Sequence, residues 1–480
     1  MAHSIKRNFI YNMLLGISRV VFPLITAPYV SRVLEPDGIG LFNFANTLAG
    51  YFAMFGALGI PYYGIREIAK IGNNKEEQTL FVSEIISISV IATIFSTIVF
   101  IASLYFIPQL NENYAIFLIA GIVLYITPFR VDWFFSGLEE FGYITFRSLI
   151  IKTLGVVLLF IFVREKDDLI DYIWLGVLTT ILNELWNYVK LYKRGIRPRF
   201  TLTGKRHLKP LLVLFSSAIA ISIYTVMDTL MLGFLSDYTE VGYYNCATHI
   251  SKAILPIVTS LAAVVLPQVA VMKEGQRWVE INGLMNKSFS IVGFMAFPIM
   301  FGIIAIAPTF TPLFFGQQFY GAILPLQIIM ITIVAIGFSN LTGIQILLGF
   351  GFDKYFLYSV LTGTITNFSL NLTLIPAYGA VGAACASVVA EILIVIVMMW
   401  YVYHKTPIRF DCRKEIIIDF VLGGTFVIAY LLISRFVTGW FLVFLFMLVC
   451  ITWYLAVQYM LGNSSEVIIL NIIKNKIAKR

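Results

Sequence analysis

Charged residues are scarce in this chain. Only 12% of its 480 residues are Asp, Glu, Lys or Arg, whereas 59% are hydrophobic, and the mean hydropathy is +0.88. A soluble globular domain normally has about 25% charged residues. The low charge and the high hydropathy exclude an ordinary soluble domain and indicate a chain that lies in a membrane.

Cysteine and histidine are also sparse, with four of each. No cysteines have the spacing of a disulfide framework or a zinc site, so we expect free thiols and no metal. The sequence has no Walker-type GxxxxGKS or GxxxxGKT stretch for binding nucleotide phosphates. No predicted loop is longer than about 20 residues, which leaves no room for a soluble catalytic domain. We therefore predict a protein that has no cofactor and no catalytic residues and is not an enzyme.

Apolar runs long enough to cross a bilayer recur along the whole chain. We count about 14, each near the roughly 20 residues that a hydrocarbon core of ~30 Å requires. The predicted spans are 8–33, 39–64, 79–107, 114–138, 143–163, 169–191, 209–235, 240–268, 281–306, 320–348, 355–375, 378–403, 416–435 and 438–461. The first run is too long for a signal sequence and lacks a small-residue cleavage site. The predicted fold class is an all-α polytopic membrane protein.

The basic residues predict how the chain is oriented. With the N-terminus inside, the inner loops and tails hold most of the Lys and Arg, whereas the outer loops hold Arg164, Lys166 and Arg435. By the positive-inside rule, both termini are predicted to be cytoplasmic and the protein to lie in the cell membrane. The net charge of +8 is thereby mostly accounted for. It gives no argument for a nucleic-acid partner, which would also need a soluble domain to bind it.

A short pattern, GxxNxA, occurs at Gly40 and again at Gly242. Each copy follows a short acidic turn and opens the second helix of a predicted six-helix set. An even number of helices in each set makes the two copies parallel repeats, related by an axis along the membrane normal. We predict an N-lobe over 1–200, a C-lobe over 201–405 and a basic linker over 190–210. Two further helices and a basic interfacial tail occupy 406–480.

Two stretches resemble a known family. "SRVLEPDGIGLFNFANTL" at 31–48 resembles the first-loop signature of the bacterial lipid-linked oligosaccharide flippases, which are Wzx-type members of the multidrug/oligosaccharidyl-lipid/polysaccharide exporter superfamily. "IPAYGAVGAACASVVAE" at 375–391 resembles a second signature. The resemblance implies two six-helix lobes around a cleft that opens alternately to each side. It implies transport of undecaprenyl-diphosphate-linked oligosaccharide to the outer leaflet, with membrane lipid and a glycan polymerase as further partners.

Polar and charged residues inside the spans are the candidate site residues, because a charge at mid-bilayer needs a partner or a water-filled cavity. A polar stripe with helical spacing runs along span 240–268, and Arg19 lies near the middle of the first span. Arginine suits a phosphate because it binds it bidentately. We predict the substrate-binding residues to be Arg19, Arg32, Asn43, Asn245, His249 and Lys252. The open alternatives are an interhelical hydrogen-bond seam for the stripe and an acidic partner for Arg19.

Other charges in the spans point to structural roles. Arg130, Asp132, Arg147 and Glu184 are predicted to form an ion-pair cluster that holds the N-lobe together, with a substrate role as the alternative. Glu84 and Lys287 lie within two turns of the inner interface, so we expect their side chains to extend towards the water.

Transport outward needs energy, and without a nucleotide-binding motif an ion gradient is the expected source. Asp228 is the predicted coupling residue, because the corresponding position of the other repeat is the uncharged Thr26. Glu391 is the second candidate. The alternative is that Asp228 only neutralises a cation of the cleft such as Lys252.

Two other function classes remain open. A cation-coupled multidrug exporter of the same superfamily would share the helix pattern, but it would present acidic residues to a cationic drug. A polymerase or glycosyltransferase that uses lipid-linked sugars would be expected to have a sizeable outer loop or a compact acidic motif. The mainly basic candidates and the short outer loops favour the flippase.

Overall fold

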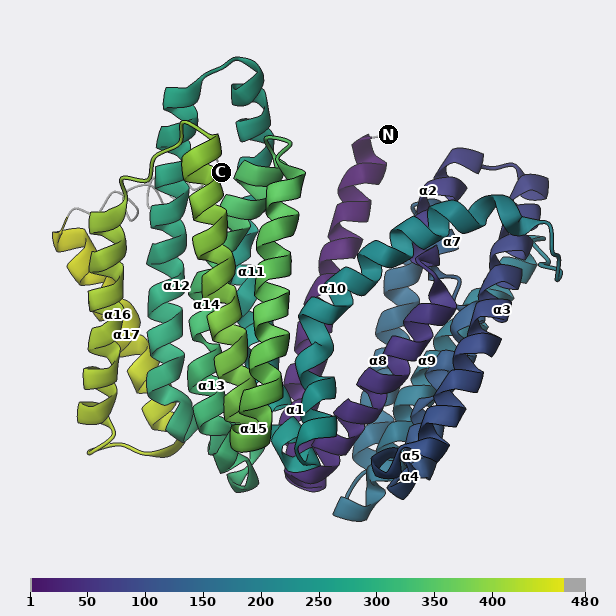
Figure 1. The fold of residues 1–480 in the computed structure, drawn as a ribbon. Helices are drawn as coiled ribbons and strands as arrows, with labels where there is room; N and C mark the ends of the chain where they lie inside the picture. The colour runs from purple at the N-terminus through teal and green to yellow at the C-terminus, as the bar shows by residue number, and fades with distance from the viewer. Residues whose placement is uncertain (1, 462–480) are drawn as a thin grey trace. The chain divides into compact units, whose positions relative to one another are not determined.

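The computed structural model describes residues 2–461, and within them all regular elements are helical (Figure 1). Eight of the helices in this range are long and apolar enough to cross a membrane, and shorter apolar helices accompany them. The prediction of an all-α multi-pass membrane protein is therefore confirmed. Contacts divide the chain into two compact units, Met1–Gly242 and Tyr243–Arg480, called unit 1 and unit 2 below.

Unit 1 is built from thirteen helical elements and the start of a fourteenth, α11 (Tyr238–Glu274), which continues into unit 2. They are α1 (Ala2–Ala57), α2 (Ile60–Ile71), α3 (Lys75–Phe106), α4 (Pro108–Glu112), α5 (Tyr114–Ala120), α6 (Ile122–Tyr125), η1 (Thr127–Phe129), α7 (Asp132–Gly137), α8 (Phe141–Phe162), η2 (Lys166–Asp168), α9 (Leu169–Lys193), η3 (Gly204–His207) and α10 (Leu208–Leu235). α1 packs against α3, α8 and α10, and α2 packs against α7.

Unit 2 is arranged around α12, which contacts α14, α16 and α17. Its further elements are α12 (Trp278–Phe315), η4 (Gln317–Ala322), α13 (Ile323–Ile329), α14 (Ile331–Ser339), η5 (Asn340–Leu348, a π-helix), α15 (Asp353–Lys405), α16 (Arg413–Ile433) and α17 (Gly439–Met460). α15 packs against α13, α14 and η5.

The two longest helices each contain a break where the sequence predicts a turn between two spans. A straight helix of the length of α1, 56 residues, would extend about 84 Å, far beyond a hydrocarbon core of about 30 Å. Its path changes at Glu35, with φ 58° and ψ 176°, directly before Pro36. Proline disfavours helical geometry in the residue before it, so the chain turns there. α15 changes path at Gly379, with φ 51°, a backbone conformation that glycine adopts readily.

The predicted span 114–138 is not one continuous helix. In the structure it consists of α5, α6, η1 and α7, and the helix stops at Phe129 and begins again at Asp132. Pro128 contributes to this interruption because it lacks a backbone N–H and restricts Thr127 before it. The predicted span 39–64 is interrupted as well, at Leu58 and Gly59, which both have positive φ.

The side chains of α3 are distributed as expected for a helix in lipid. Its buried face carries small polar residues, such as Ser87 and Ser96, which are 1% and 3% exposed. Its exposed face carries large apolar residues, such as Ile94, Phe95 and Ile98, which are 56%, 70% and 62% exposed. Small residues let membrane helices approach closely, and large apolar side chains are stable in hydrocarbon. This pattern is the reverse of the one in a soluble helix.

Candidate functional site

The two copies of the GxxNxA pattern meet at their glycines. A Cβ atom on Gly40 would collide with the backbone carbonyl of Tyr238 and would lie 2.9 Å from the amide nitrogen of Gly242. A Cβ atom on Gly242 would in turn collide with the carbonyl oxygen of Pro36. Both positions therefore need glycine, because only a residue without a side chain lets the two backbones touch. Asn43 lies one turn further along α1, where its amide donates to the carbonyl of Ile39 at 2.9 Å.

A buried polar network connects α7, α8 and α9 in unit 1. Arg147, only 2% exposed, forms an ion pair with Asp132 at 2.6 Å and also donates to the Asn187 side-chain oxygen. The Asn187 amide nitrogen donates to Asp132 at 3.1 Å and to Glu184 at 3.0 Å. Tyr143 donates its hydroxyl proton to Asn187 at 3.2 Å. The structure thus brings together three of the four residues of the predicted cluster, with Asn187 at the centre.

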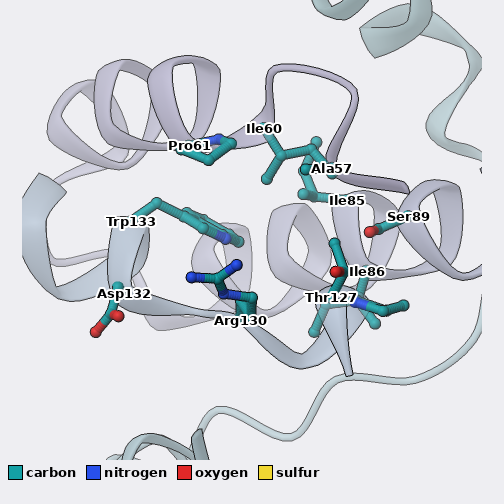
Figure 2. A pocket seen from close by; sticks show the side chains of 11 residues that line it. Ala57, Ile60, Pro61, Ile85, Ile86, Ser89, Thr127, Arg130, Asp132 and Trp133 are labelled. Carbon is teal, nitrogen blue, oxygen red and sulfur yellow. The ribbon is translucent and has the colours of Figure 1, made fainter. Parts of the chain in front are cut away.

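Arg130, the fourth residue, is exposed and lines a cavity of about 240 Å³ in unit 1. Figure 2 shows its guanidinium group on the cavity side, beneath the ring of Trp133, and Asp132 lines the same cavity. Among the described residues, none forms an ion pair or a hydrogen bond with the Arg130 side chain. The structure therefore separates Arg130 from the pair between Asp132 and Arg147.

The two predicted cations of α1 lie in different surroundings. Arg19 is exposed, and among the described residues none forms an ion pair with it. The neighbouring cation Lys152 donates to the hydroxyl of Ser18 at 2.9 Å. Arg32 is exposed and lines a cavity of about 650 Å³ together with Glu35, whose carboxylate pairs with Lys166 at 2.6 Å.

The polar stripe of α11 is placed in unit 2. Asn245 and His249 are half-buried, and Lys252 is exposed. Lys252 lies near enough to His249 for its charge to act on the imidazole ring. The two groups thus lie on one part of the helix, as their spacing predicts.

The two candidate coupling residues lie in different units. Asp228 is half-buried on α10 and acts electrostatically on Tyr51 of α1, whose hydroxyl donates to the carbonyl of Ser222 at 2.9 Å. Glu391 is 8% exposed on α15.

Contrary to the prediction from the sequence, the side chain of Glu84 does not extend towards the water. It is 2% exposed and accepts hydrogen bonds from Thr203 at 2.9 Å and Arg206 at 2.7 Å. The ring of His207 lies 2.9 Å from the same carboxylate and 2.7 Å from the hydroxyl of Tyr63. The basic linker therefore binds to α3 through a buried acid. The sequence places many cations in the linker but does not indicate which acid receives them.

Sequence reasoning also missed Glu140, which lies just before α8. Lys190 and Arg194, at the end of α9, both pair with its carboxylate. Burial disfavours the charged form of Glu140, but the hydrogen bonds from these two cations outweigh burial and hold the pKa of the carboxyl below its usual range. The sequence shows that the end of α9 is basic, but it does not indicate that Glu140 is the acid with which these cations pair.

Comparison with known proteins gives consistent matches. The family model described as "Polysaccharide biosynthesis protein" matches residues 5–273. A protein of Escherichia coli (strain K12) with the name "Putative O-antigen transporter" is 26% identical over 411 residues, which are 84% of this chain and 97% of that protein.

Two solved structures have a similar fold. The lipid II flippase MurJ, in an inward closed conformation, aligns with a TM-score of 0.73 at 14% identity, over 94% of this chain and 98% of that chain. An inward-facing multidrug resistance transporter of the MATE family, in the MOP superfamily, aligns with a TM-score of 0.54 at 14% identity, over 86% and 95%. At this identity the likeness shows a shared, MOP-like fold.

Proposed function

Because the chain belongs to the polysaccharide biosynthesis protein family, we propose that it is a flippase for undecaprenyl-diphosphate-linked oligosaccharide repeat units. It moves them from the inner to the outer leaflet of the cell membrane by alternating access and contains no catalytic residues. The observation that carries this proposal is the match to the Escherichia coli protein with the name "Putative O-antigen transporter", over 84% of this chain and 97% of that protein. The glycan polymerase that extends the exported units is its proposed functional partner.

The finer architecture is part of the same proposal. The chain forms 14 transmembrane helices, with six in each of two pseudo-symmetric lobes and two at the C-terminal end. The lobes are residues 1–200 and 201–405, and the cleft between them is water-accessible. The proposed headgroup ligands are the cations Arg19, Arg32 and Lys252, and Asn43, Asn245 and His249 contact the sugars. Mainly basic candidates suit a diphosphate, since arginine and phosphate pair bidentately.

A multidrug exporter is the second candidate function, because the fold is also similar to that of a MATE family transporter. A cationic drug would require acidic groups at its site, whereas most of the exposed charged candidates here are basic. Expression in a bacterial strain that lacks its own repeat-unit flippase distinguishes the two. We expect wild-type protein to restore surface glycan without changing drug resistance. Increased drug resistance without restored glycan would favour the exporter.

We predict that both termini and the linker at 190–210 are cytoplasmic. Single-cysteine variants Phe200→Cys and Asp237→Cys, made in a background without the four native cysteines, test this orientation. A membrane-impermeant thiol reagent applied to intact cells should label position 237 and leave position 200 unlabelled. Labelling of position 200 from outside would contradict the assignment, and labelling of both positions in opened cells is the accessibility control.

The cations of the proposed cleft are expected to be required for export. Arg19→Ala and Lys252→Ala should reduce surface glycan severely while the protein remains in the membrane at normal levels, because each removes an exposed cation from the proposed headgroup site. Surface glycan and membrane protein are both measured by immunoblotting. Arg66→Ala is the control and should export as the wild type does, since Arg66 pairs with the neighbouring Glu67 at the surface. Wild-type export by both variants would remove them from the site.

Asp228 is the proposed ion-coupling residue, with Glu391 as the second. Asp228→Asn keeps the shape of the side chain and removes its charge, so it should uncouple substrate movement from an imposed proton or sodium gradient in reconstituted vesicles. The control is transport without a gradient, which should continue in the variant. Gradient-driven transport equal to that of the wild type would exclude Asp228 from coupling.

A further inference from the structure

We propose that the cavity beside Arg130 is a binding site for a glycosyl phosphate, namely the sugar and phosphate at the headgroup of the lipid-linked substrate. This inference rests on the proposed function and adds a site to it. The sequence placed Arg130 in a structural cluster, whereas the structure directs its side chain into a cavity (Figure 2).

The cavity lies where two helical paths are broken. One is the interruption between α1 and α2, which contributes Ala57, Ile60 and Pro61, and the other is the segment from η1 to α7. In hydrocarbon, backbone without helical hydrogen bonds is tolerated only inside protein or beside a water-filled cavity. In many transporters such broken helices form the substrate site. Two breaks around one cavity are therefore a reason to expect a ligand there.

The charge at the cavity favours an anion. Both Arg130 and Asp132 line the cavity (Figure 2), but the carboxylate of Asp132 is already held by Arg147 and Asn187. Glu184 accepts from Asn187 at 3.0 Å, so its carboxylate is also partly satisfied within the network. The guanidinium group can therefore offer its parallel N–H donors to a phosphate, whose geometry it matches bidentately.

The neutral groups at the cavity favour a sugar. The hydroxyl of Ser89 donates its proton to the carbonyl of Gly56 at 2.8 Å, and that of Thr127 donates to the carbonyl of Val123 at 3.0 Å. Each hydroxyl oxygen keeps acceptor capacity for a donor such as a sugar hydroxyl. Their oxygens are drawn in Figure 2 together with the apolar walls from Ile60 and Ile85.

Trp133 provides a fixed wall. It is 4% exposed, its ring packs on Gly64, and its centroid lies 5.9 Å from that of Phe81. The cavity, at about 240 Å³, is smaller than the roughly 300–1,000 Å³ of pockets for drug-sized ligands. It therefore suits one sugar residue with its phosphate better than a complete oligosaccharide. In the proposed topology it lies towards the cytoplasmic side, where a substrate would enter.

The test is equilibrium binding to purified full-length protein in phosphatidylcholine nanodiscs, with N-acetylglucosamine 1-phosphate as the probe. We expect saturable binding to the wild type, a Kd at least tenfold higher for Arg130→Gln, and an intermediate Kd for Arg130→Lys. Arg66→Gln is the matched control and should bind as the wild type does. Equal affinity of wild type and Arg130→Gln, or no saturable binding to the wild type, overturns the proposal.

Two further arms identify the ligand class. Thr127→Val should weaken binding of the sugar phosphate but not of inorganic phosphate, because it removes the acceptor for a sugar hydroxyl and leaves Arg130 in place. Equal weakening of both would contradict the sugar contact. Phosphatidylglycerol in the nanodiscs should leave the Kd unchanged within twofold, whereas displacement of the probe by this lipid would identify a general lipid-headgroup site and overturn the assignment.

If Arg130 only balances the charge of Glu184 and binds no ligand, the binding experiment gives a different result. Such a role predicts that Arg130→Gln lowers the melting temperature of the ligand-free protein and leaves the affinity for the probe unchanged, which overturns the proposal. Export by the wild type in the flippase-deficient strain is measured separately. Failure of that export contradicts the proposed function, whereas export together with unchanged binding by Arg130→Gln contradicts only the site.

Discussion

Gly40→Ala is expected to deplete folded protein from the membrane. The added methyl group would collide with the backbone carbonyl of Tyr238, and a backbone atom in a helix cannot rotate away as a side chain can. Overpacking usually costs about 1–3 kcal/mol, and we expect a value near the upper end here because the contact is between two backbones. Gly242→Ala should have the same effect through the carbonyl of Pro36. The measurement is the yield of monodisperse protein after detergent extraction.

Gly50→Ala is the matched control. Gly50 lies on the same helix, and a Cβ atom built on it meets nothing within 4 Å. Replacing a helical glycine by alanine favours the helix by about 1 kcal/mol, so this variant should be as stable as the wild type or slightly more stable. Equal yields of the Gly40 variant and this control would contradict the close contact.

Arg147→Ala is expected to have a comparably large effect on stability. It removes the positive partner of a buried network and leaves Asp132 and Glu184 without their charge compensation from α8. Breaking a buried ion pair by removing one partner costs about 3–5 kcal/mol. Because the side chain of Asp132 is 46% exposed, we expect a loss near 3 kcal/mol. The measurement is the midpoint of thermal unfolding of the purified protein.

Two variants separate this effect from a general loss of charge. Lys193→Ala removes an exposed cation at the end of α9 and should leave the midpoint unchanged. Asn187→Leu removes the central amide but keeps both charges of the ion pair, so its effect should be smaller than that of Arg147→Ala. An unfolding midpoint of Arg147→Ala equal to that of the wild type would mean that the network does not stabilise unit 1.

The helical membrane fold could be predicted from the sequence because long apolar runs with few charges have few other stable solutions. The breaks at Glu35 and Gly379 were also predictable, since proline and glycine interrupt the apolar pattern at both, together with acidic residues at the first. The break after Phe129 was not. Hydropathy averaged over a whole span does not resolve it, because apolar residues lie on both sides of Arg130 and Asp132. The backbone requirements of Pro128 and the charges that follow it were the signals that the helix could end there.

The candidate site was less predictable, because sequence spacing identifies a face of one helix but not the partner that it meets. Asp132, Arg147 and Glu184 were recognised as charges in apolar spans. Asn187, a neutral residue one turn from Glu184, gave no comparable signal although it connects all three. Arg130 could not be distinguished from them, since only the three-dimensional path of η1 and α7 directs it into the cavity.

Transport by the isolated protein tests the central claim most directly. Purified protein is reconstituted into liposomes that contain undecaprenyl-diphosphate-linked oligosaccharide, and a glycan-oxidising reagent that cannot cross the bilayer is added outside. In protein-free liposomes the inner-leaflet half of the glycan should stay protected. With wild-type protein, we expect the reagent to oxidise nearly all of the glycan, including the half that starts in the inner leaflet. With Lys252→Ala, most of the inner-leaflet half should stay protected. Protection in wild-type proteoliposomes equal to that in protein-free liposomes, with or without a proton or sodium gradient, would contradict the flippase assignment.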